Sequence, residues 1–416
     1  PWCGRCCLRA IPPAWHDHYV VSMPDVELPF SREEYAARLA KVRVAMDAAG
    51  VDVMVAADPS NMSWLTGYDG WSFYTPQAVV VGPDGEPWWW GRRMDANGAR
   101  RTVYMDGSRI LDYSDDHVMS TERHAFGQLG GLLCDLGLGS GRVGVELDNY
   151  YYSAAAHQNL VAALPDVEVV DATGLVNWQR GVKSEQELTY MRRAARIVEL
   201  MHDRVRELIE PGMRKCDLVG EIYRTAMTGT DEFGGDYAAF VPILATGADA
   251  SAPHLTWDDK PFERDAGTFF EIAGAHRRYQ LPLCRSVYLG VPPPAMLEAE
   301  RALIEGLEAG LEAARAGNRA CDVANALYDT MERYGIHKEG RCGYPIGISY
   351  PPDWGERTIS FRPTDESILV PGMTFHFMPG LWMDDWGLEI TESLVITDEG
   401  PAETLANYPR ELFVKP

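Results

Sequence analysis

The segment 267–274 places a single carboxylate inside an apolar run that favours a β-strand. It reads Gly-Thr-Phe-Phe-Glu-Ile-Ala-Gly, so Glu271 lies between Phe270 and Ile272. A charge in such a place costs free energy unless it is paired or used by the protein. Burial would raise the pKa of Glu271, which is one way in which a carboxyl group becomes useful in catalysis. The local pattern alone favours a simpler interpretation, in which Glu271 faces solvent or forms an ion pair.

Local signals divide the chain into two halves of different character. In the first half, Ser31 and Glu34 form a capping pair for a helix that Gly50 closes. In the second half, Ser184 and Glu187 form another capping pair, and long helices alternate with hairpins. The patterns predict an α/β domain followed by an α+β domain. The expected elements are strands at 51–57, 78–81, 87–90, 142–147 and 167–170, then helices at about 185–209, 215–229, 294–315 and 319–334, and strands near 239–245, 268–274, 284–289, 373–379 and 387–396.

We expect three segments along the chain. They are an extension at 1–22, a first domain at 23–180 and a catalytic domain at 181–416. The extension crowds three cysteines (Cys3, Cys6 and Cys7), and we expect it to be disordered or foreign to the native protein. The alternative is a zinc knuckle completed by His16 or His18, but its spacing matches no standard zinc module.

The composition excludes several classes of partner. The formal net charge is −23, which argues against nucleic acid and against an anionic membrane as partner. A cationic small molecule remains compatible with it. No signal peptide or membrane-spanning run is visible, and the remaining cysteines show no pairing logic. We therefore expect a cytoplasmic protein.

Several motifs follow one another in the order seen in the pita-bread hydrolases. These include methionine aminopeptidase, aminopeptidase P, prolidase and creatinase, and the resemblance runs from about Phe30 to the C-terminus. It implies an α/β N-terminal domain followed by an α+β pita-bread catalytic domain, usually in a homodimer. The motifs lie at 182–197, 209–213, His254, 285–286, 343–347, 370–373 and 389–397.

The resemblance also implies that a metal site has been lost. Metallopeptidases of this family hold two metal ions with two Asp, one His and two Glu, which are oxygen and imidazole ligands suited to divalent ions. Aligned by the motifs, these positions fall on Ile272, Pro282, Tyr344, Met378 and Thr391. Ile and Pro offer no donor, so we expect no metal and no other cofactor, as in creatinase. A shift by one residue would bring Glu271 and Glu392 onto ligand positions, with the other three still lost.

Within the metal-free branch, four further segments resemble the ectoine hydrolases. The resemblance implies opening of the cyclic amidine ectoine, and of its hydroxylated relative, to N-acetyl-L-2,4-diaminobutyrate. The substrate would be an ectoine-like zwitterion, and a separate deacetylase would act on the product. The segments are 61–74, 95–100, 247–261 and 380–390.

Two residues are the candidate catalytic groups. Glu271 would attack the ring carbon as a nucleophile, or activate water as a general base, and both roles require its ionised form. His254 aligns with the catalytic histidine of creatinase-like enzymes and would carry a proton to the departing ring nitrogen. Without the resemblance, a lone histidine is more often structural.

The candidate substrate-binding residues are carboxylates, aromatic residues, and one arginine. Because Glu389 and Glu392 are expected on one strand, only one of them should face the substrate, and we favour Glu392. Aromatic faces attract cations, and in a homodimer Trp71, Phe73 and Tyr74 would reach the partner's site. Tyr344 would offer a hydroxyl, Arg357 would bind the substrate carboxylate, and Arg285 is expected to brace Glu271 or to bind ligand. The full set is Asp249, Trp71, Phe73, Tyr74, Tyr344, Arg357, Asp385 and Glu392.

Three other functions remain open. A creatinase-like enzyme would hydrolyse a guanidino acid, but Cys284 and Met378 stand where creatinase has glutamates. A metallopeptidase of the prolidase or aminopeptidase P type would need the missing ligands. A non-catalytic binding protein would bind a partner without turnover, and a buried glutamate facing His254 would argue against it.

Overall fold

The computed structural model describes residues 24–416, which divide into two compact units between Gln179 and Arg180. The extension expected at 1–22 lies outside the described residues. Among the helices of residues 24–416, none is both long enough and apolar enough to cross a membrane.

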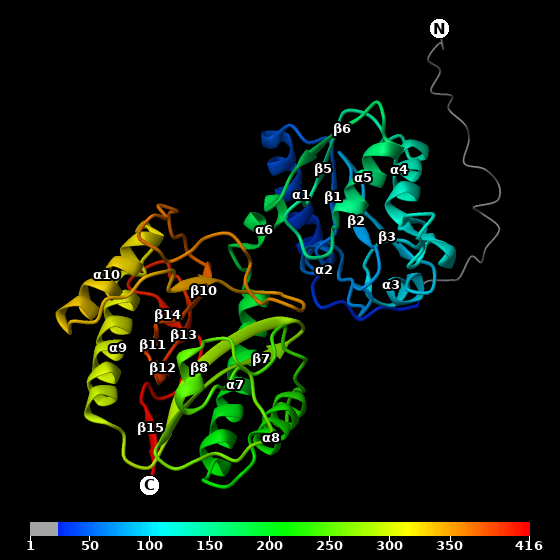
Figure 1. The fold of residues 1–416 in the computed structure, drawn as a ribbon. Helices are drawn as coiled ribbons and strands as arrows, with labels where there is room; N and C mark the ends of the chain where they lie inside the picture. The colour runs from blue at the N-terminus through cyan, green and yellow to red at the C-terminus, as the bar shows by residue number, and fades with distance from the viewer. Residues whose placement is uncertain (1–23) are drawn as a thin grey trace. The chain divides into compact units, whose positions relative to one another are not determined.

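The first unit is built around a mixed sheet with strand order β4-β3-β2-β1-β5-β6. Helix α1 lies on one face of this sheet, and α4 and α5 lie on the other (Figure 1). The core between the sheet and helices α4 and α5 contains Trp90, Phe126 and Leu160. The elements are α1 (Arg32–Ala49), β1 (Val53–Ala56), α2 (Pro59–Thr66), β2 (Ala78–Val81), β3 (Trp88–Arg92), α3 (Ala96–Thr102), η2 (Gly107–Arg109), β4 (Ile110–Tyr113), η3 (Asp115–His117), α4 (Ala125–Asp135), β5 (Arg142–Val145), α5 (Ala154–Ala163), β6 (Glu168–Asp171) and α6 (Leu175–Arg180).

Local signals set the limits of the first elements as expected. The Ser31 hydroxyl accepts a hydrogen bond from the backbone N–H of Glu34, and Gly50 ends α1 in the left-handed conformation with φ of 64°. Strands β2 and β3 pair antiparallel across the predicted turn. These cap and turn residues bond to groups only a few residues away in the sequence, so the limits of the elements can be predicted without knowledge of the rest of the fold.

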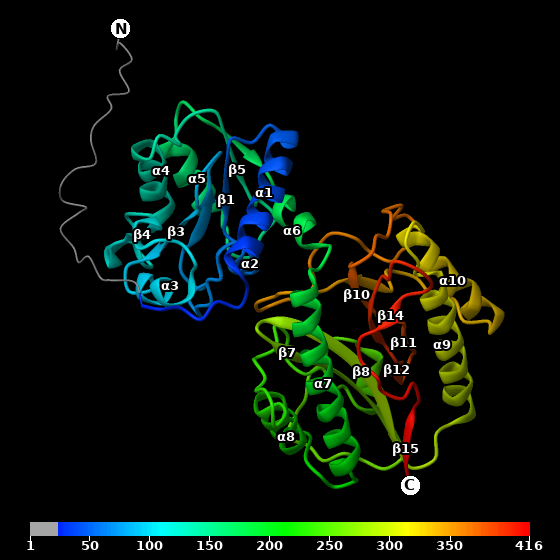
Figure 2. The same cartoon turned by 180° about the vertical axis from the view of Figure 1, so that it is seen from behind.

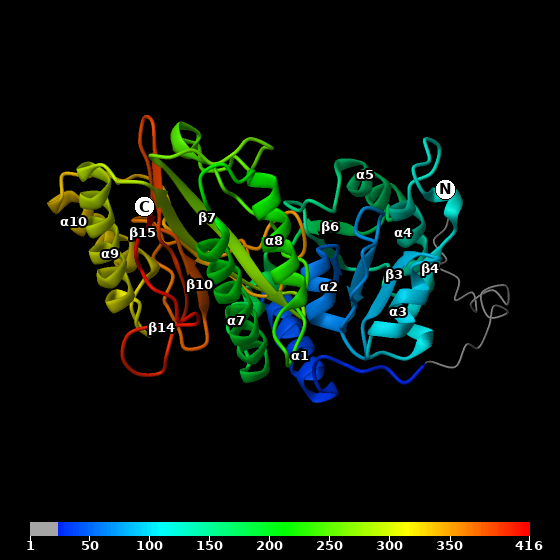
Figure 3. The same ribbon diagram turned by 90° about the horizontal axis from the view of Figure 1, so that it is seen from below.

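The second unit places small sheets between two pairs of long helices. Figure 1 and Figure 3 show α7 and α8 on one side of the strands and α9 and α10 on the other. The sheets have the orders β15-β8-β7, β14-β13-β10-β9 and β11-β12. The elements are α7 (Glu185–Leu208), α8 (Lys215–Thr228), η4 (Gly247–Ser251), β7 (Ala266–His276), β8 (Tyr279–Leu289), α9 (Pro294–Ala313), α10 (Ala320–Arg333), β9 (Gly343–Pro345), β10 (Thr374–Phe377), β11 (Gly380–Trp382), β12 (Gly387–Glu389), β13 (Glu392–Val395), β14 (Glu403–Thr404) and β15 (Phe413–Lys415).

The hairpin of β7 and β8 is the backbone on which the chemistry of this unit rests. Its strands pair over eleven consecutive residues and are buried along almost their whole length. Helix α7 begins with the predicted capping box of Ser184 and Glu187 and lies along the hairpin, as Figure 2 shows from behind. At Gly274 a Cβ would stand 2.1 Å from the carbonyl oxygen of Ala194 in α7. Glycine therefore lets the helix pack directly onto the strand.

Two predicted strands differ from the structure. Residues 239–245 form only isolated bridges, including Ile243 with Glu271, and not a continuous strand. The strand predicted at 387–396 is broken at Ile390 and Thr391, so β12 and β13 belong to different sheets. The break matters because the argument from alternating side chains holds only within one continuous strand.

Candidate active site

Glu271 is a buried carboxylate held in place at both edges of its strand. It pairs with Cys284 of β8 on one side, and on the other its backbone N–H and C=O both bond Ile243 at 3.0 Å. The residue is 8% exposed, so it does not face solvent freely. Burial, and secondarily the charge of Glu389, raises the pKa of Glu271 well above its usual range.

The register of the hairpin shows which residues share a face with Glu271. Glu271 lies opposite Cys284, and Ala273 lies opposite Pro282, so these four residues share one face. Ile272 lies opposite Leu283 and points to the other face. Glu271, and not Ile272, therefore lies on the same face of the hairpin as Pro282.

A chain of hydrogen bonds runs beside Glu271. Trp354 Nε1 donates to the Tyr344 hydroxyl at 2.7 Å, and that hydroxyl lies 3.0 Å from Nδ1 of His376. Nε2 of His376 lies 2.9 Å from Oγ1 of Thr391, which also accepts the backbone N–H of Cys284 at 2.8 Å. His376 Nδ1 stands 3.9 Å from Oε1 of Glu271. The chain links β9, β10 and β8 through Tyr344, His376 and Cys284, and it fixes the groups that surround the carboxylate.

His376 is neutral in this environment. Burial, and after it the charges of Arg285 and Arg341, lowers the pKa of His376 to about 3. A neutral imidazole with one donor and one acceptor fits a chain in which Nδ1 accepts from Tyr344 and Nε2 donates to Thr391. Burial and the nearby charge of Glu271 raise the pKa of Tyr344 well above its usual range, so its hydroxyl keeps its proton.

Glu389 is a second buried carboxylate near Glu271, on a strand that pairs Glu389 with Gly380. It is 1% exposed, and the pKa of its carboxyl group is raised to about 7 by burial, a rise that the Cys284 thiol and Lys338 oppose. The pKa of the buried Cys284 thiol is raised in turn by burial and by both carboxylates. From the sequence, one continuous strand was expected to turn only one of Glu389 and Glu392 toward the substrate, and Glu392 was favoured because it adjoins Thr391 of the family motif. The strand is in fact broken between the two residues.

Glu392 is engaged in ion pairs. Its Oε1 accepts from Arg285 at 2.7 Å and from Arg410 at 2.9 Å, and Glu392 is 1% exposed. The expectation that Arg285 braces Glu271 is therefore wrong. Arg285 instead joins Glu392 to the C-terminal segment through the carbonyl oxygens of Tyr408 and Pro409.

The other candidates of the second unit lie in exposed segments. His254 and Asp249 belong to the exposed residues in and after η4, Asp385 lies in the turn between β11 and β12, and Arg357 is exposed with φ of 57°. None of the polar contacts described above for Glu271 involves His254. Helix η4 is nevertheless held close to β12, because a Cβ at Gly387 would stand 2.0 Å from the carbonyl oxygen of Ala250.

The three aromatic candidates belong to the first unit. Trp71 and Tyr74 are 57% and 62% exposed, and the rings of Trp71 and Phe73 lie 4.8 Å apart. They form an exposed aromatic group in the segment between α2 and β2.

The residues near Glu271 do not fit a binuclear metal centre. Tyr344 and Thr391 take part in the hydrogen-bond chain, and Pro282 and Met378 supply no oxygen or imidazole side chain. Among residues 24–416, no group of three or more His, Cys, Asp or Glu side chains could hold a metal ion.

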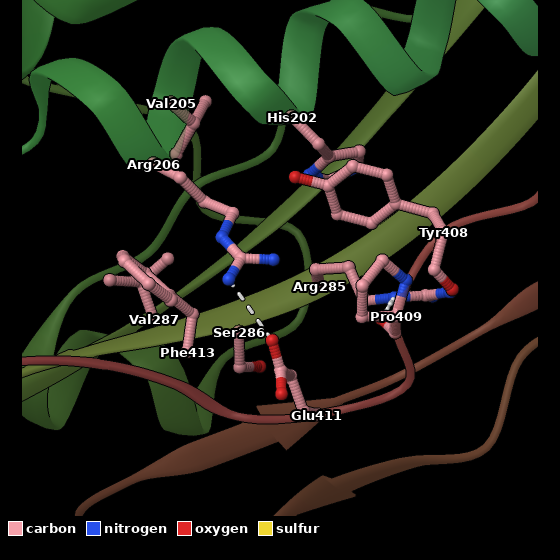
Figure 4. A pocket seen from close by; sticks show the side chains of 10 residues that line it. All are labelled: His202, Val205, Arg206, Arg285, Ser286, Val287, Tyr408, Pro409, Glu411 and Phe413. Atoms are coloured by element: carbon pink, nitrogen blue, oxygen red, sulfur yellow. Dashed lines mark hydrogen bonds and ion pairs between the residues drawn. The ribbon is translucent and has the colours of Figure 1, made fainter.

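A separate pocket lies beside α7 and the C-terminal segment (Figure 4). Arg206 pairs with Glu411 across it at 3.0 Å, and His202 and Tyr408 line it with their rings 5.4 Å apart. Neither Glu271 nor Glu389 lines this pocket. Its charged groups Arg206, Glu411 and Arg285 are held in ion pairs, and the buried hydroxyl of Tyr408 has no hydrogen-bond partner by geometry among the described residues.

Comparison with known proteins assigns the chain to a family. Residues 189–398 match the model of Metallopeptidase family M24, and residues 38–182 match that of the Creatinase/Prolidase N-terminal domain. The chain belongs to metallopeptidase family M24. Together, the two matches place this M24 member in the creatinase/prolidase superfamily and confirm the predicted fold class.

Relatives of this M24 member align along nearly its whole length. The ectoine hydrolase of Halomonas elongata is 59% identical over 400 residues, which cover 94% of this chain and 100% of the relative. An uncharacterized hydrolase/peptidase of Sinorhizobium fredii is 42% identical over 389 residues, covering 93% and 99%. The prolidase of Thermococcus sibiricus superposes with a TM-score of 0.78 at 18% identity, covering 92% and 99%, and shows the fold alone. The M24 member is accordingly a hydrolase with a pita-bread catalytic domain.

Two features of the site were missed at the level of sequence. His376 lies in Thr374-Phe-His-Phe377, a polar residue within an apolar strand, which is the same signal that indicated Glu271. Glu389 lies between Leu388 and Ile390 and so has the same signal, but Glu392 was favoured over it, and the break between β12 and β13 that separates the two was not foreseen.

Proposed function

We propose that this protein hydrolyses the cyclic amidine ring of ectoine, and of hydroxyectoine, to N-acetyl-L-2,4-diaminobutyrate without a metal ion. The observation that carries the proposal is Glu271, a buried carboxylate on the face of the β7–β8 hairpin that also holds Cys284 and Pro282. The 59% identity to an ectoine hydrolase supports the choice of substrate. Replacement of the family's metal ligands by Pro282, Tyr344, Met378 and Thr391 supports a reaction carried by side chains.

In the proposed reaction, Glu271 acts on the ring carbon between the two nitrogens. As a nucleophile, Glu271 bonds to this carbon through a carboxylate oxygen. One ring nitrogen takes a proton, and the bond between that nitrogen and the ring carbon breaks, which leaves the carbon attached to Glu271. Water then adds to the same carbon and releases Glu271, which leaves an acetamido group and a free amine. As a base, Glu271 takes a proton from water, whose oxygen bonds to the ring carbon. One ring nitrogen then takes a proton, and its bond to that carbon breaks to give the same acetamido group and free amine. Both routes require the ionised carboxylate, which the cationic amidinium favours once it is bound.

His254 would supply the proton to the departing nitrogen. Because His254 is exposed, this role requires its turn to approach Glu271 when substrate binds. His376 is less suited to the task, since burial lowers the pKa of its imidazole to about 3. Asp249, Asp385 and Arg357 lie in exposed segments and would contact substrate through the same closure.

We also propose a cytoplasmic homodimer in which Trp71, Phe73 and Tyr74 complete the partner's site. The exposure of Trp71 and Tyr74 supports this role, since large exposed aromatic groups often mark interaction sites. A separate deacetylase would then consume the product. Sedimentation analysis tests the dimer, and a dimer that dissociates when Trp71 and Tyr74 are replaced by alanine would support it.

One experiment tests the activity itself. The purified protein is incubated with ectoine, with and without a strong chelator, and the products are followed by NMR. Ring opening that proceeds equally in both samples supports the proposal. Failure to open the ring in either sample, while X-Pro dipeptides are cleaved after manganese is added, would overturn it.

A further inference from the structure

Glu389 combines deep burial with an almost complete lack of partners. The residue is 1% exposed, and neither carboxylate oxygen has a hydrogen-bond partner by geometry among the described residues. The Cys284 thiol, a weak donor, is the one group that shares polar contact with it. A buried carboxylate left in this state is costly, and native proteins seldom keep one without a use.

The backbone of Glu389 is held in place by the Ser286 side chain. The Ser286 hydroxyl, from β8, lies 3.0 Å from both the carbonyl oxygen and the backbone nitrogen of Glu389. These two contacts hold the strand end in place next to the hairpin that carries Glu271. The side chain therefore lacks partners while its own main chain is fully bonded, so a poorly fitted strand is not the cause.

Glu389 lies near the other buried carboxylate of the site. Strand β12, which carries Glu389, packs against β7, which carries Glu271, and the charge of Glu389 contributes to the raised pKa of both Glu271 and Cys284. Lys338 is the one cation found to influence it, and the ammonium of Lys338 donates to the carbonyl oxygen of Gly380 at 2.5 Å. No ion pair within 4.0 Å joins Lys338 to Glu389 among the described residues. The side chain of Glu271 keeps 11% exposure, so solvent reaches the pair from its side.

We infer that Glu389 is the anchor for the cationic amidinium of the substrate, and that its two free oxygens receive the N–H groups of that cation. The inference rests on the proposed function and deepens it. An amidinium presents planar N–H donors that match a carboxylate in the way a guanidinium does. Glu389 then holds the cation while Glu271 reacts with the carbon between its nitrogens. A neutral amide of the same shape would leave the pair of carboxylates without a counter-charge.

Small probes separate this role from catalysis. Acetamidinium chloride is a planar cation with N–H donors, acetamide is its neutral counterpart, and tetramethylammonium chloride is a cation without such donors. Thermal unfolding of the wild-type protein is measured with each probe. We expect acetamidinium to raise the unfolding midpoint and the other two to leave it unchanged. A wild-type protein that responds equally to acetamide or tetramethylammonium would overturn the inference.

The variant Glu389→Gln keeps the shape and removes the charge. Loss of charge-assisted hydrogen bonds should weaken acetamidinium binding and raise KM for ectoine by roughly 10- to 100-fold, with a smaller change in kcat. Glu389→Asp should recover part of the affinity. Asp384→Asn removes an exposed carboxylate from the turn between β11 and β12 and serves as the matched control, with wild-type binding and KM.

The outcomes separate the inference from the proposed function. If the wild-type protein opens ectoine and Glu389→Gln keeps the wild-type KM, the anchor is wrong and the activity stands. If acetamidinium binds through Glu389 but ectoine is not opened, the anchor stands and the proposed activity falls. If Glu389→Gln does not fold, the shifts in unfolding midpoint that the three probes cause in the wild-type protein and in Glu389→Asp test the anchor instead. Equal shifts with all three probes would refute it.

Discussion

Arg285 forms an ion pair with Glu392 at 2.7 Å. Its neighbour in β8, Cys284, points to the opposite face of the strand. The Arg285 guanidinium also bonds the carbonyl oxygens of Tyr408 and Pro409. Arg285 thus holds the C-terminal segment in place. The adjacent Cys284 pairs with Glu271 across the hairpin, and the Ser286 hydroxyl contacts the backbone of Glu389. One face of this short stretch of strand therefore carries an ion pair, and the other lies beside the two buried carboxylates.

Glu392→Gln should destabilise the protein strongly. It leaves Arg285 buried without its carboxylate, and breaking a buried ion pair in this way costs about 3–5 kcal/mol. Urea unfolding measures the loss. Glu411→Gln is the matched control, because its ion pair with Arg206 is partly exposed and should contribute less than about 1 kcal/mol. Equal losses in the free energy of unfolding for the two variants would show that the buried Arg285–Glu392 pair contributes no more than the exposed one.

Glu271→Gln should abolish ring opening while the protein still folds. The amide can neither attack the ring carbon nor take a proton from water, so kcat should fall by roughly 100- to 10,000-fold or more. The rate is followed by NMR of the acetylated product, and the unfolding midpoint serves as the control for folding. Turnover within a few-fold of wild type would rule out both roles proposed for Glu271.

Tyr344→Phe should lower both stability and turnover. The change leaves Nε1 of Trp354 and Nδ1 of His376 without the hydroxyl that they share, and an unsatisfied buried polar group costs about 1–3 kcal/mol. Thermal unfolding and kcat are measured together. A stable variant with normal kcat would mean that the hydrogen-bond chain does not position the site.

The two buried histidines should each contribute less stability as the pH drops below about 6.5. Burial lowers the pKa of His376 and of His202 to about 3, so between pH 6.5 and pH 3 the unfolded chain binds protons at these positions that the folded protein does not. Each histidine then removes about 1.4 kcal/mol per pH unit as the pH falls, while Glu389 and Glu271, whose pKa values burial raises, act in the opposite direction. Urea unfolding of the wild-type protein and of His202→Gln between pH 5 and pH 7 isolates the contribution of one histidine. The stability of the variant should fall less steeply, or rise more steeply, than that of the wild type as the pH drops, and identical slopes would contradict the assignment.

Removal of metal should not change the activity. The positions of the family's ligands hold side chains that bind one another or lack donor atoms, so dialysis against a strong chelator should leave kcat within about twofold of its starting value. A prolidase treated in parallel should lose activity. Recovery of lost turnover by manganese, cobalt or zinc would show that the site holds a metal after all.

Signals that act over a few residues were enough to predict much of the fold. Ser31 and Gly50 limit α1, and the capping box of Ser184 and Glu187 opens α7. Contacts between distant segments were harder to predict. The break at Thr391 separates Glu389 from Glu392, and it becomes visible only when the Thr391 hydroxyl is seen to accept the backbone N–H of Cys284. The partner of Arg285 likewise depends on where the C-terminal segment runs.

Because Gly387 has no side chain, β12 can lie directly against helix η4, which is far from it in the sequence. Because Ala250 lies directly against Gly387, the closure proposed for the turn that carries Asp249 and His254 must come from the residues on either side of Ala250. Any added carbon at 387 would push this turn outward, away from the strand end that bears Glu389. A protein engineer who wants to admit bulkier rings should therefore reshape the chain beyond Ala252 and leave this glycine untouched.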